Sequence, residues 1–318
     1  MENEKAMELG IHMPTSGPLA TPDNLVALAQ RAERLGFSII TAGDHIVVPR
    51  RIESPYPYSR IHRPRTEHRW LDQMTALAFL AAHTTKVRLL TSVMVVPYRH
   101  PLMAAKALAT IDVLSGGRLI VGCGIGWMEE EFQLLGLPPF RHRGTVSNDY
   151  IRAIKELWTS DNPTFEGSYV RFSDVWFDPR PVQKPHPPIW IAGESPAALK
   201  RAGRLGDGWE PVVNHPEFPL DTPEQVARSL AEVQRYAREA GRDPSRIEVA
   251  YEAEWNSKQA RILPDGNRRA FTGNREQIRS DVVAFDQIGV RYAIFTLPHT
   301  SPETCVERME AIAEFAGS

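Results

Sequence analysis

Cysteine is scarce in this sequence, and long apolar runs are absent from it. The two cysteines, Cys123 and Cys305, lie far apart in the chain, and neither has the CxxC or Cys/His spacing of a metal site. The first residues are polar, without the apolar stretch of a signal peptide behind them, and no apolar run approaches the ~20 residues that span a bilayer. We therefore expect a cytoplasmic protein without a metal site, because free thiols suit a reducing compartment.

An excess of one charge is also lacking. The 37 lysines and arginines nearly balance the 39 aspartates and glutamates, so the net charge is −2, with no overall basic footprint for nucleic acid. The GxSxG, GxxxxGK[ST] and HExxH signatures of serine hydrolases, kinases and zinc proteases do not occur. With 42% hydrophobic residues in 318, the chain can bury a sizeable core.

Short apolar segments alternate with helical segments along the whole chain. Thr21, Pro22 and Gly36 illustrate the signals: a capping hydroxyl, a proline at the first helical position and a glycine stop. The expected strands are 7–14, 37–41, 87–95, 118–122, 188–192, 208–213, 247–252 and 291–297, and the expected helices are 22–36, 70–84, 101–114, 148–158, 196–205, 223–240, 275–288 and 302–315. Eight alternating units pair in parallel and favour a (β/α)8 barrel, or TIM barrel, that occupies residues 1–318 as a single domain.

Two long segments interrupt the alternation. Residues 163–188 predict a hairpin followed by a proline-rich connector, and residues 48–69 carry six arginines, Arg50, Arg51, Arg60, Arg63, Arg65 and Arg69. We expect insertion loops at the C-terminal face of the barrel, where barrel chemistry lies. The arginines suit the carboxylate or phosphate groups of an acidic ligand, or they belong to a solvated loop.

Asp44 and His45 directly follow the second expected strand. Histidine can give or take a proton near neutral pH, and a neighbouring carboxylate can orient the ring or hold its charge. In a solvated loop the same pair would have no task. We favour an acid–base role, because the C-terminal end of a barrel strand is where such chemistry is placed.

Glycines end the fourth expected strand, in the stretch GCGIGW. The third glycine, Gly126, comes one residue too early for the Rossmann fingerprint, and Trp127 stands where that glycine should be. Glycines here still permit a flat ring or a phosphate to approach the backbone, or they make a tight turn only. Further on, Ser195 is expected to cap the helix that begins at Pro196, either as plain capping or as an anion site.

Four blocks of the sequence resemble the luciferase-like monooxygenase superfamily, flavin and deazaflavin enzymes built on a (β/α)8 barrel. They are LGFSIITAGDH, LDQMTALAFLAAHTTKVRLLTSVMVVPYRHP, AKALATIDVLSGGRLIVGCGIGWMEEEF and PHPPIWIAGESPAALKRAGRLGDGW. The set is most similar to the branch of F420-dependent oxidoreductases. The resemblance extends from Leu9 to Leu297 and implies that the cofactor ring lies across the C-terminal mouth of the barrel.

The resemblance also implies a role for individual residues. A non-prolyl cis peptide behind the ring maps to Ser92 and Val93, the ribityl contacts to Gly124, Ile125 and Gly126, and the phosphate grip to Gly193, Glu194 and Ser195. The Asp-His pair maps to Asp44 beside the ring and His45 in proton transfer. Ile125 departs from the threonine of several F420 enzymes. Residues 255–274 match nothing diagnostic, so the resemblance does not identify the substrate.

We therefore predict an oxidoreductase in which F420 exchanges a hydride with a small organic substrate, while His45 moves the proton and Asp44 orients it. The first alternative is an FMN-dependent two-component monooxygenase that uses O2 and a partner reductase. The second is a non-catalytic flavin-binding barrel, although such relatives tend to lose barrel units. The resemblance also implies a homodimer.

Overall fold

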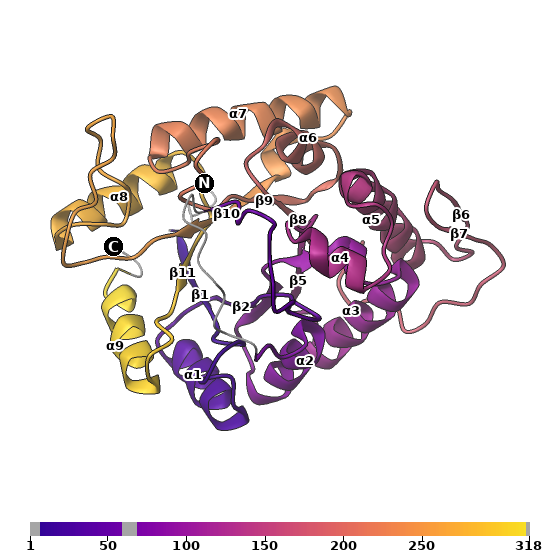
Figure 1. Cartoon of the computed structure of the whole chain (residues 1–318), viewed down its shortest axis with the longest axis horizontal. Coiled ribbons are helices and arrows are strands. Elements are labelled where there is room, and N and C mark those ends of the chain that lie inside the picture. The colour runs from indigo at the N-terminus through magenta and orange to yellow at the C-terminus, as the bar shows by residue number, and fades with distance from the viewer. Residues whose placement is uncertain (1–6, 59–68, 316–318) are drawn as a thin grey trace.

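Residues 7–58 and 69–315 are described by the structure, a computed structural model, and their strands close into one parallel barrel inside a ring of helices (Figure 1). The barrel strands are β1 (Glu8–His12), β2 (Ile39–Ala42), β3 (Arg88–Thr91), β4 (Met94–Val95), β5 (Leu119–Gly124), β8 (Ile189–Ala192), β9 (Gly208–Glu210), β10 (Glu248–Ala253) and β11 (Tyr292–Thr296). All neighbours pair in parallel, and an additional pairing of β3 with β5 closes the ring. The predicted (β/α)8 fold is confirmed.

The outer layer consists of helices that return the chain from one strand to the next. The longer ones are α1 (Pro22–Arg34), α2 (Gln73–His83), α3 (Pro101–Ser115), α5 (Arg143–Thr159), α6 (Pro196–Leu205), α7 (Pro223–Glu239), α8 (Arg275–Gln287) and α9 (Pro302–Ala313). The shorter ones are α4 (Glu129–Leu134), η1 (Val96–Tyr98), η2 (Phe140–His142) and η3 (Pro244–Arg246). Among the described residues, no helix has the length and apolar character needed to cross a membrane.

Helix ends follow the local signals of the sequence. Thr21 accepts a hydrogen bond from the amide of Asn24 ahead of α1, and Ser195 accepts one from Ala198 at 3.3 Å ahead of α6. Gly36 has a φ of +85° just beyond α1, a conformation that disfavours a side chain. Because these signals act within one turn, the bounds of both helices lie close to the predicted ones.

At the third barrel position the strand is interrupted, which we call the break, although the chain is continuous. β3 ends at Thr91, the peptide bond between Ser92 and Val93 is cis, and β4 then resumes pairing with β5. The cis bond that the family resemblance implied at this position is therefore present. It places Ser92 and Val93 between two strand segments at the C-terminal end of the barrel.

The fourth unit departs from the prediction. α5 begins at Arg143 rather than Asn148, and runs through Gly144, Thr145 and Val146, which are weak helix formers. Val146 is buried, so tertiary packing overrides local propensity here. The six-residue α4 was not predicted, because a helix this short has little stability or periodicity of its own.

The barrel interior has an apolar lower part and a polar upper part. The apolar residues are Ile39, Leu90, Ile120, Trp190, Ala250, Tyr292 and Ile294. Side chains alternate along a strand, so the next inward position towards the C-terminal end lies two residues on. These upper positions include Thr41, Ser92, Gly122, Ala192 and Glu252, and the strand register places His12 beside Thr41 and Glu210 beside Ala192. The mouth therefore has a polar floor.

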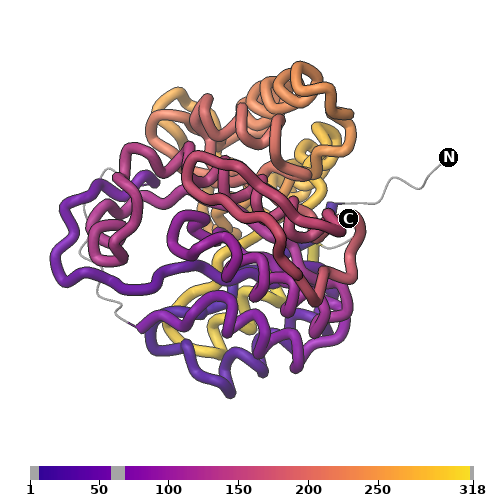
Figure 2. Tube along the Cα trace, turned by 90° about the vertical axis from the view of Figure 1, so that its right-hand side faces the viewer, coloured from indigo at the N-terminus to yellow at the C-terminus, as the bar shows by residue number. Residues whose placement is uncertain are grey.

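The two long insertions lie in different places. Segment 46–58 follows β2 and contacts α4 at the C-terminal end of the barrel, which Figure 2 shows from the side. The predicted hairpin forms as β6 (Phe165–Glu166) and β7 (Arg171–Phe172). It belongs to the connection from α5 to β8 and lies outside the ring, where Lys106 of α3 contacts the Phe177 ring. Only the first insertion therefore borders the mouth.

Candidate active site

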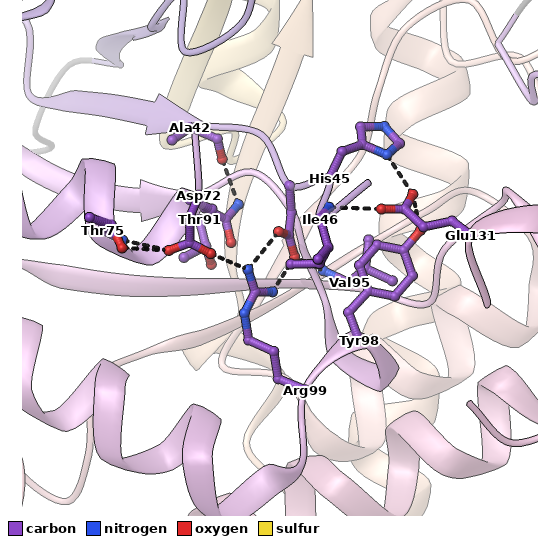
Figure 3. Close-up of polar contacts among 12 residues, drawn as sticks. Ala42, His45, Ile46, Asp72, Thr75, Thr91, Val95, Tyr98, Arg99 and Glu131 are labelled. Atoms are coloured by element: carbon purple, nitrogen blue, oxygen red, sulfur yellow. Dashed lines mark hydrogen bonds and ion pairs between the residues drawn. The ribbon is translucent and has the colours of Figure 1, made fainter. Parts of the chain in front are cut away.

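His45 is held by a buried carboxylate from another barrel unit. Its Nδ1 lies 2.7 Å from Oε2 of Glu131 on α4, and Glu131 is fully buried. The same carboxylate accepts hydrogen bonds from the amides of Ile46 and Val47 at 2.7 and 3.1 Å and from the Tyr98 hydroxyl at 2.7 Å (Figure 3). Glu131 therefore fixes both the imidazole and the chain that follows it.

The contacts of Glu131 also determine its charge. Burial raises the pKa of this carboxyl, but the hydrogen bonds and charge of His45 and the hydrogen bonds of Tyr98 and Val47 outweigh burial and leave the pKa below its usual value. An ionised carboxylate only accepts, so Nδ1 of His45 is the donor. In the neutral ring Nε2 is then the nitrogen that takes up a proton.

Asp44 has a different partner. Its two oxygens accept hydrogen bonds from the Arg99 guanidinium at 2.7 and 2.9 Å, and Oδ2 also accepts one from the amide of Val95 at 3.0 Å. Arg99 continues to Asp72, the capping residue of α2 (Figure 3). The sequence predicted that Asp44 orients His45. In the structure Glu131 binds the imidazole, and Asp44 ties the end of β2 to β4.

The break in the third barrel position lies against the glycine end of β5. A Cβ on Gly124 would lie 2.4 Å from Cγ2 of Val93. Gly126 has a φ of +82°, and a Cβ there would lie 2.7 Å from Phe132 and 2.8 Å from Val95. The structure thus brings Val93 and Gly124 into contact, and only glycine permits the close approach. Ile125, between the two glycines, is half-buried.

The predicted phosphate grip, residues 193–195, leads into α6. Gly193 has a φ of +113°, and the Ser195 hydroxyl caps the helix. The Glu194 carboxyl accepts hydrogen bonds from the amide of Val212 at 2.8 Å and the hydroxyl of Tyr58 at 3.3 Å. The side chains of Glu194 and Ser195 therefore already have partners within the protein. What the segment offers an anion is the first amides of a ten-residue helix.

Two guanidinium groups link this helix to the glycine strand end. Arg143, at the start of α5, donates from Nε to the carbonyl of Gly126 at 3.2 Å. Arg201, on α6 and nearly buried, donates to Asn148 at 2.6 Å and to the carbonyl of Gly144 at 3.2 Å. Helix amides, glycine backbone and planar cations form a donor set that fits a phosphate-bearing cofactor.

Three acids stand at the ends of successive strands: Glu194 after β8, Glu210 on β9 and Glu252 on β10. Burial raises the pKa of Glu194 and of Glu252 to about 7, and raises that of Glu210 well above its usual value. The charge of Glu252 also raises the pKa values of Glu194 and Glu210, and the charge of Glu194 further raises the pKa of Glu210. At neutral pH this side of the mouth therefore holds protons as well as charge.

His12 belongs to the polar floor beneath the mouth. Its Nδ1 lies 2.5 Å from Oγ1 of Thr41. Burial, followed by the charge of His299, lowers the pKa of His12 to about 4. His12 is therefore a neutral hydrogen-bonding group at pH 7 rather than a proton carrier.

Segment 46–58 is anchored on both sides of the mouth. On the α4 side, the amides of Glu53 and Ser54 donate to the Glu130 carboxylate at 2.6 and 2.9 Å. On the other side, the carbonyl of Tyr58 accepts a hydrogen bond from Asn214 at 3.1 Å. The segment thus spans the mouth from the second barrel unit to the loop after β9.

The structure describes only some of the six arginines of residues 48–69. Arg60, Arg63 and Arg65 lie outside the described residues, so the clamp for an acidic ligand stays a prediction. Of the remaining arginines, Arg51 forms an exposed ion pair with Glu53. Within residues 7–58 and 69–315, no group of three His, Cys, Asp or Glu side chains is arranged to hold a metal ion.

Sequence reasoning missed three acids of the site, Glu131, Glu210 and Glu252. Glu131 ends a run of three glutamates that is typical of a solvated helix start, so nothing local distinguishes it. Glu210 is the last residue of β9 and Glu252 the last but one of β10, both at inward positions. Period-two alternation, counted up from the apolar layer, was the available signal for both.

Fold and geometry together define a (β/α)8 barrel whose C-terminal mouth holds a buried His45–Glu131 pair and a glycine strand end packed against the cis peptide of the third strand. The chain belongs to the luciferase-like monooxygenase family, whose family model matches residues 7–256. This is a family of oxidoreductases and monooxygenases that includes F420-dependent and FMN-dependent members.

Relatives of both cofactor types are similar in sequence. An F420-dependent glucose-6-phosphate dehydrogenase of Amycolatopsis mediterranei is 36% identical over 194 residues, 59% of this chain and 53% of that one. An FMNH(2)-dependent dimethylsulfone monooxygenase of Pseudomonas putida is 36% identical over 182 residues, 57% of this chain and 46% of that one. The match thus spans about half the length of each relative. An uncharacterized protein of Mycobacterium tuberculosis is 32% identical over 227 residues, 70% of this chain and 78% of that one.

Solved structures share the fold at low identity. The monooxygenase RslO1 from Streptomyces bottropensis has a TM-score of 0.72 at 24% identity, and an F420-dependent secondary alcohol dehydrogenase has 0.75 at 18%. Both matches cover 98% of each chain. The barrel is therefore shared from end to end, and the choice of cofactor varies within the family.

The first prediction concerns Glu131. Glu131→Ala leaves two amides, a hydroxyl and the imidazole without their common acceptor, so we expect the free energy of unfolding to fall by about 2–4 kcal/mol. Urea denaturation followed by tryptophan fluorescence measures the change. Limited proteolysis should cut segment 46–58 faster in the variant.

Glu129→Ala is the matched control. Glu129 lies on the same short helix but is exposed, so its removal should change stability by no more than about 0.5 kcal/mol. Equal destabilisation by the two substitutions would mean that the helix start matters and the carboxylate contacts do not.

The second prediction concerns the pH dependence that Glu252 imposes. Burial raises the pKa of Glu252 to about 7 from a usual value of 4.5, so the native state binds the proton more tightly than the unfolded state. Its contribution is most favourable below pH 4.5 and is lost as pH rises through 7. Glu252→Gln should therefore gain roughly 1–3 kcal/mol over the wild type at about pH 8 and little at pH 4.5.

Glu130→Gln provides a control of opposite sign. Burial raises the pKa of Glu130, but hydrogen bonds from Ser54 and Glu53 outweigh burial and lower it. Removing this carboxylate should cost stability at neutral pH and less in acid. Urea titrations across this range decide both cases, and parallel curves for wild type and Glu252→Gln would contradict the role of Glu252.

Proposed function

We propose that this protein is an F420-dependent oxidoreductase that moves a hydride to or from a small organic substrate. The observation that carries the proposal is the buried His45–Glu131 pair at the end of β2. It lies at the same mouth of the barrel as the close contact between Val93 and Gly124. F420 is the cofactor of one relative that is 36% identical. The arginines of residues 48–69 suit the acidic tail that distinguishes F420 from FMN.

The cofactor supplies the carbon that carries the hydride, and the protein supplies position and proton transfer. His45 gives or takes the proton through Nε2, because Glu131 accepts the hydrogen on Nδ1. Glu131 also stabilises the imidazolium when the ring is charged. Asp44 acts from a distance: it binds Arg99 and the Val95 amide, which holds the end of β2 in register with β4.

The donor set of the mouth supports a proposal for the residues that would hold the cofactor. The amides at the start of α6, with Arg201 on that helix and Arg143 beside Gly126, would hold the phosphate, and Gly124 and Gly126 would leave room for the ribityl chain against the backbone. Ser92 and Val93 would stand behind the ring. A homodimer, and a partner reductase if the cofactor must be recycled, remain predictions of the family resemblance.

A titration tests the choice of cofactor. Purified protein is stripped of bound ligand and titrated with F420 and with FMN, and binding is followed by quenching of cofactor fluorescence. We expect F420 to bind at least about tenfold more tightly. Tight FMN binding without a response to F420 would replace the proposal with an FMN-dependent monooxygenase, the cofactor type of the dimethylsulfone relative.

The role of His45 is tested separately from binding. A panel of alcohols, aldehydes and sugar phosphates is screened by the change in F420 absorbance, and the best substrate is used for kinetics. His45→Ala should lower turnover by about 100-fold or more, because a positioned general acid or base contributes that much. The dissociation constant of His45→Ala for F420 should stay within about twofold of the wild-type value. His83→Ala, an exposed histidine at the end of α2, should change neither quantity. Unchanged turnover in His45→Ala would refute the role.

A further inference from the structure

Glu210 presents an unusual state for an acid. It ends β9, its side chain is fully buried, and it reaches across the barrel to the third strand position, where Oε1 accepts a hydrogen bond from Oγ of Ser92 at 2.6 Å. Among the described residues, Oε2 is buried and has no hydrogen-bond partner, and no lysine or arginine pairs with this carboxyl. A buried oxygen in this position requires an explanation.

The surroundings of Gly122 supply one. On the face of Gly122 where a Cβ would point, the carbonyl oxygen of Thr91 lies 2.1 Å and Oε2 of Glu210 lies 2.5 Å from the Cβ position. Two acceptor oxygens therefore share the small space that the glycine leaves. A carboxylate would bring only repulsion there, whereas a carboxylic acid has a hydrogen to donate to the carbonyl.

We propose that Glu210 is a positioning residue: as a neutral carboxylic acid it accepts from Ser92 with one oxygen and donates to the carbonyl of Thr91 with the other. It thereby holds both residues that precede the break, from the opposite wall of the barrel. Val93, next in the chain, contacts Gly124 at the end of β5, where the proposed cofactor would lie. The acid thus sets the position of the surface behind the ring, a role that rests on the proposed cofactor site.

The charges around Glu210 keep it protonated. The titratable groups that face it are Glu252 from β10, Glu194 after β8 and the Cys123 thiol on β5. None of these is a cation, and the two glutamates add to burial in raising the pKa of Glu210. Burial and the neighbouring carboxylates therefore both favour the acid form of Glu210.

Infrared spectroscopy of the protein without cofactor tests the protonation directly. At about pH 8, where a strongly buried glutamic acid can stay neutral, we expect the carbonyl band of a carboxylic acid, lost in Glu210→Gln and retained in Glu252→Gln. Absence of the band from the wild type, or its survival in Glu210→Gln, overturns the protonation. This measurement is independent of which cofactor binds, so its failure is distinct from failure of the proposed function.

Substitutions test the positioning. Glutamine copies the acid, with one acceptor oxygen and an amide that donates, so Glu210→Gln should bind the cofactor within about twofold of the wild type. Glu210→Ala should bind it about tenfold or more weakly and shift the absorbance of the bound ring, and Ser92→Ala should shift it in the same direction. If Gln and Ala behave alike, or if neither moves the spectrum, Glu210 does not hold the break.

If Glu210→Ala fails to fold, Glu210→Leu keeps the volume without either hydrogen bond and takes its place. The proposal then requires that Gln rescues what Leu loses. If the charge of a carboxylate were what held the third strand, glutamine would not rescue, and the Gln and Leu variants would lose alike.

Discussion

The mouth of the barrel depends on one buried carboxylate, Glu131. Four donors from two other parts of the chain converge on it: His45 with the two amides that follow, and the Tyr98 hydroxyl. A six-residue helix such as α4 would not be stable alone, so these contacts position the helix as much as the helix positions the carboxylate. The imidazole, the start of segment 46–58 and α4 are therefore one unit, whose parts hold each other in place.

Asp44 gives the other side of His45 a matching support. Its contacts to Arg99 and Val95 join β2 to the strand segment beyond the break, and Arg99 extends the link to the cap of α2. Adjacent residues thus belong to different networks: His45 binds the Glu131 carboxylate, and the Asp44 carboxylate binds Arg99. Because the chain at His45 is held from both sides, the proposed proton transfer would need little rearrangement when a ligand binds. Beneath the network, His12, Glu210 and Glu252 make the floor polar where most of the barrel is apolar.

Much of the fold was predictable because its signals are local. Thr21 and Ser195 cap helices wherever they stand before a suitable turn, and alternating apolar segments identified all eight barrel positions. The exceptions share one cause, which is packing against residues distant in the sequence. α5 begins at Arg143 although its first residues are weak helix formers, since burial of Val146 outweighs propensity. In residues 255–274, Arg269 is buried between Asp221 and Glu254, an arrangement that no local pattern announces.

The sequence by itself determined the barrel, the strand ends and the place of Asp44 and His45 at the mouth, because periodicity and capping act over a few residues. Only the tertiary structure decided the partners. Glu131 is 86 residues from His45 and Glu210 is 118 from Ser92, and each pair meets because parallel strands bring their C-terminal ends to one rim. The protonation of Glu210 was decided there too, since burial and neighbouring charge exist only in the folded chain.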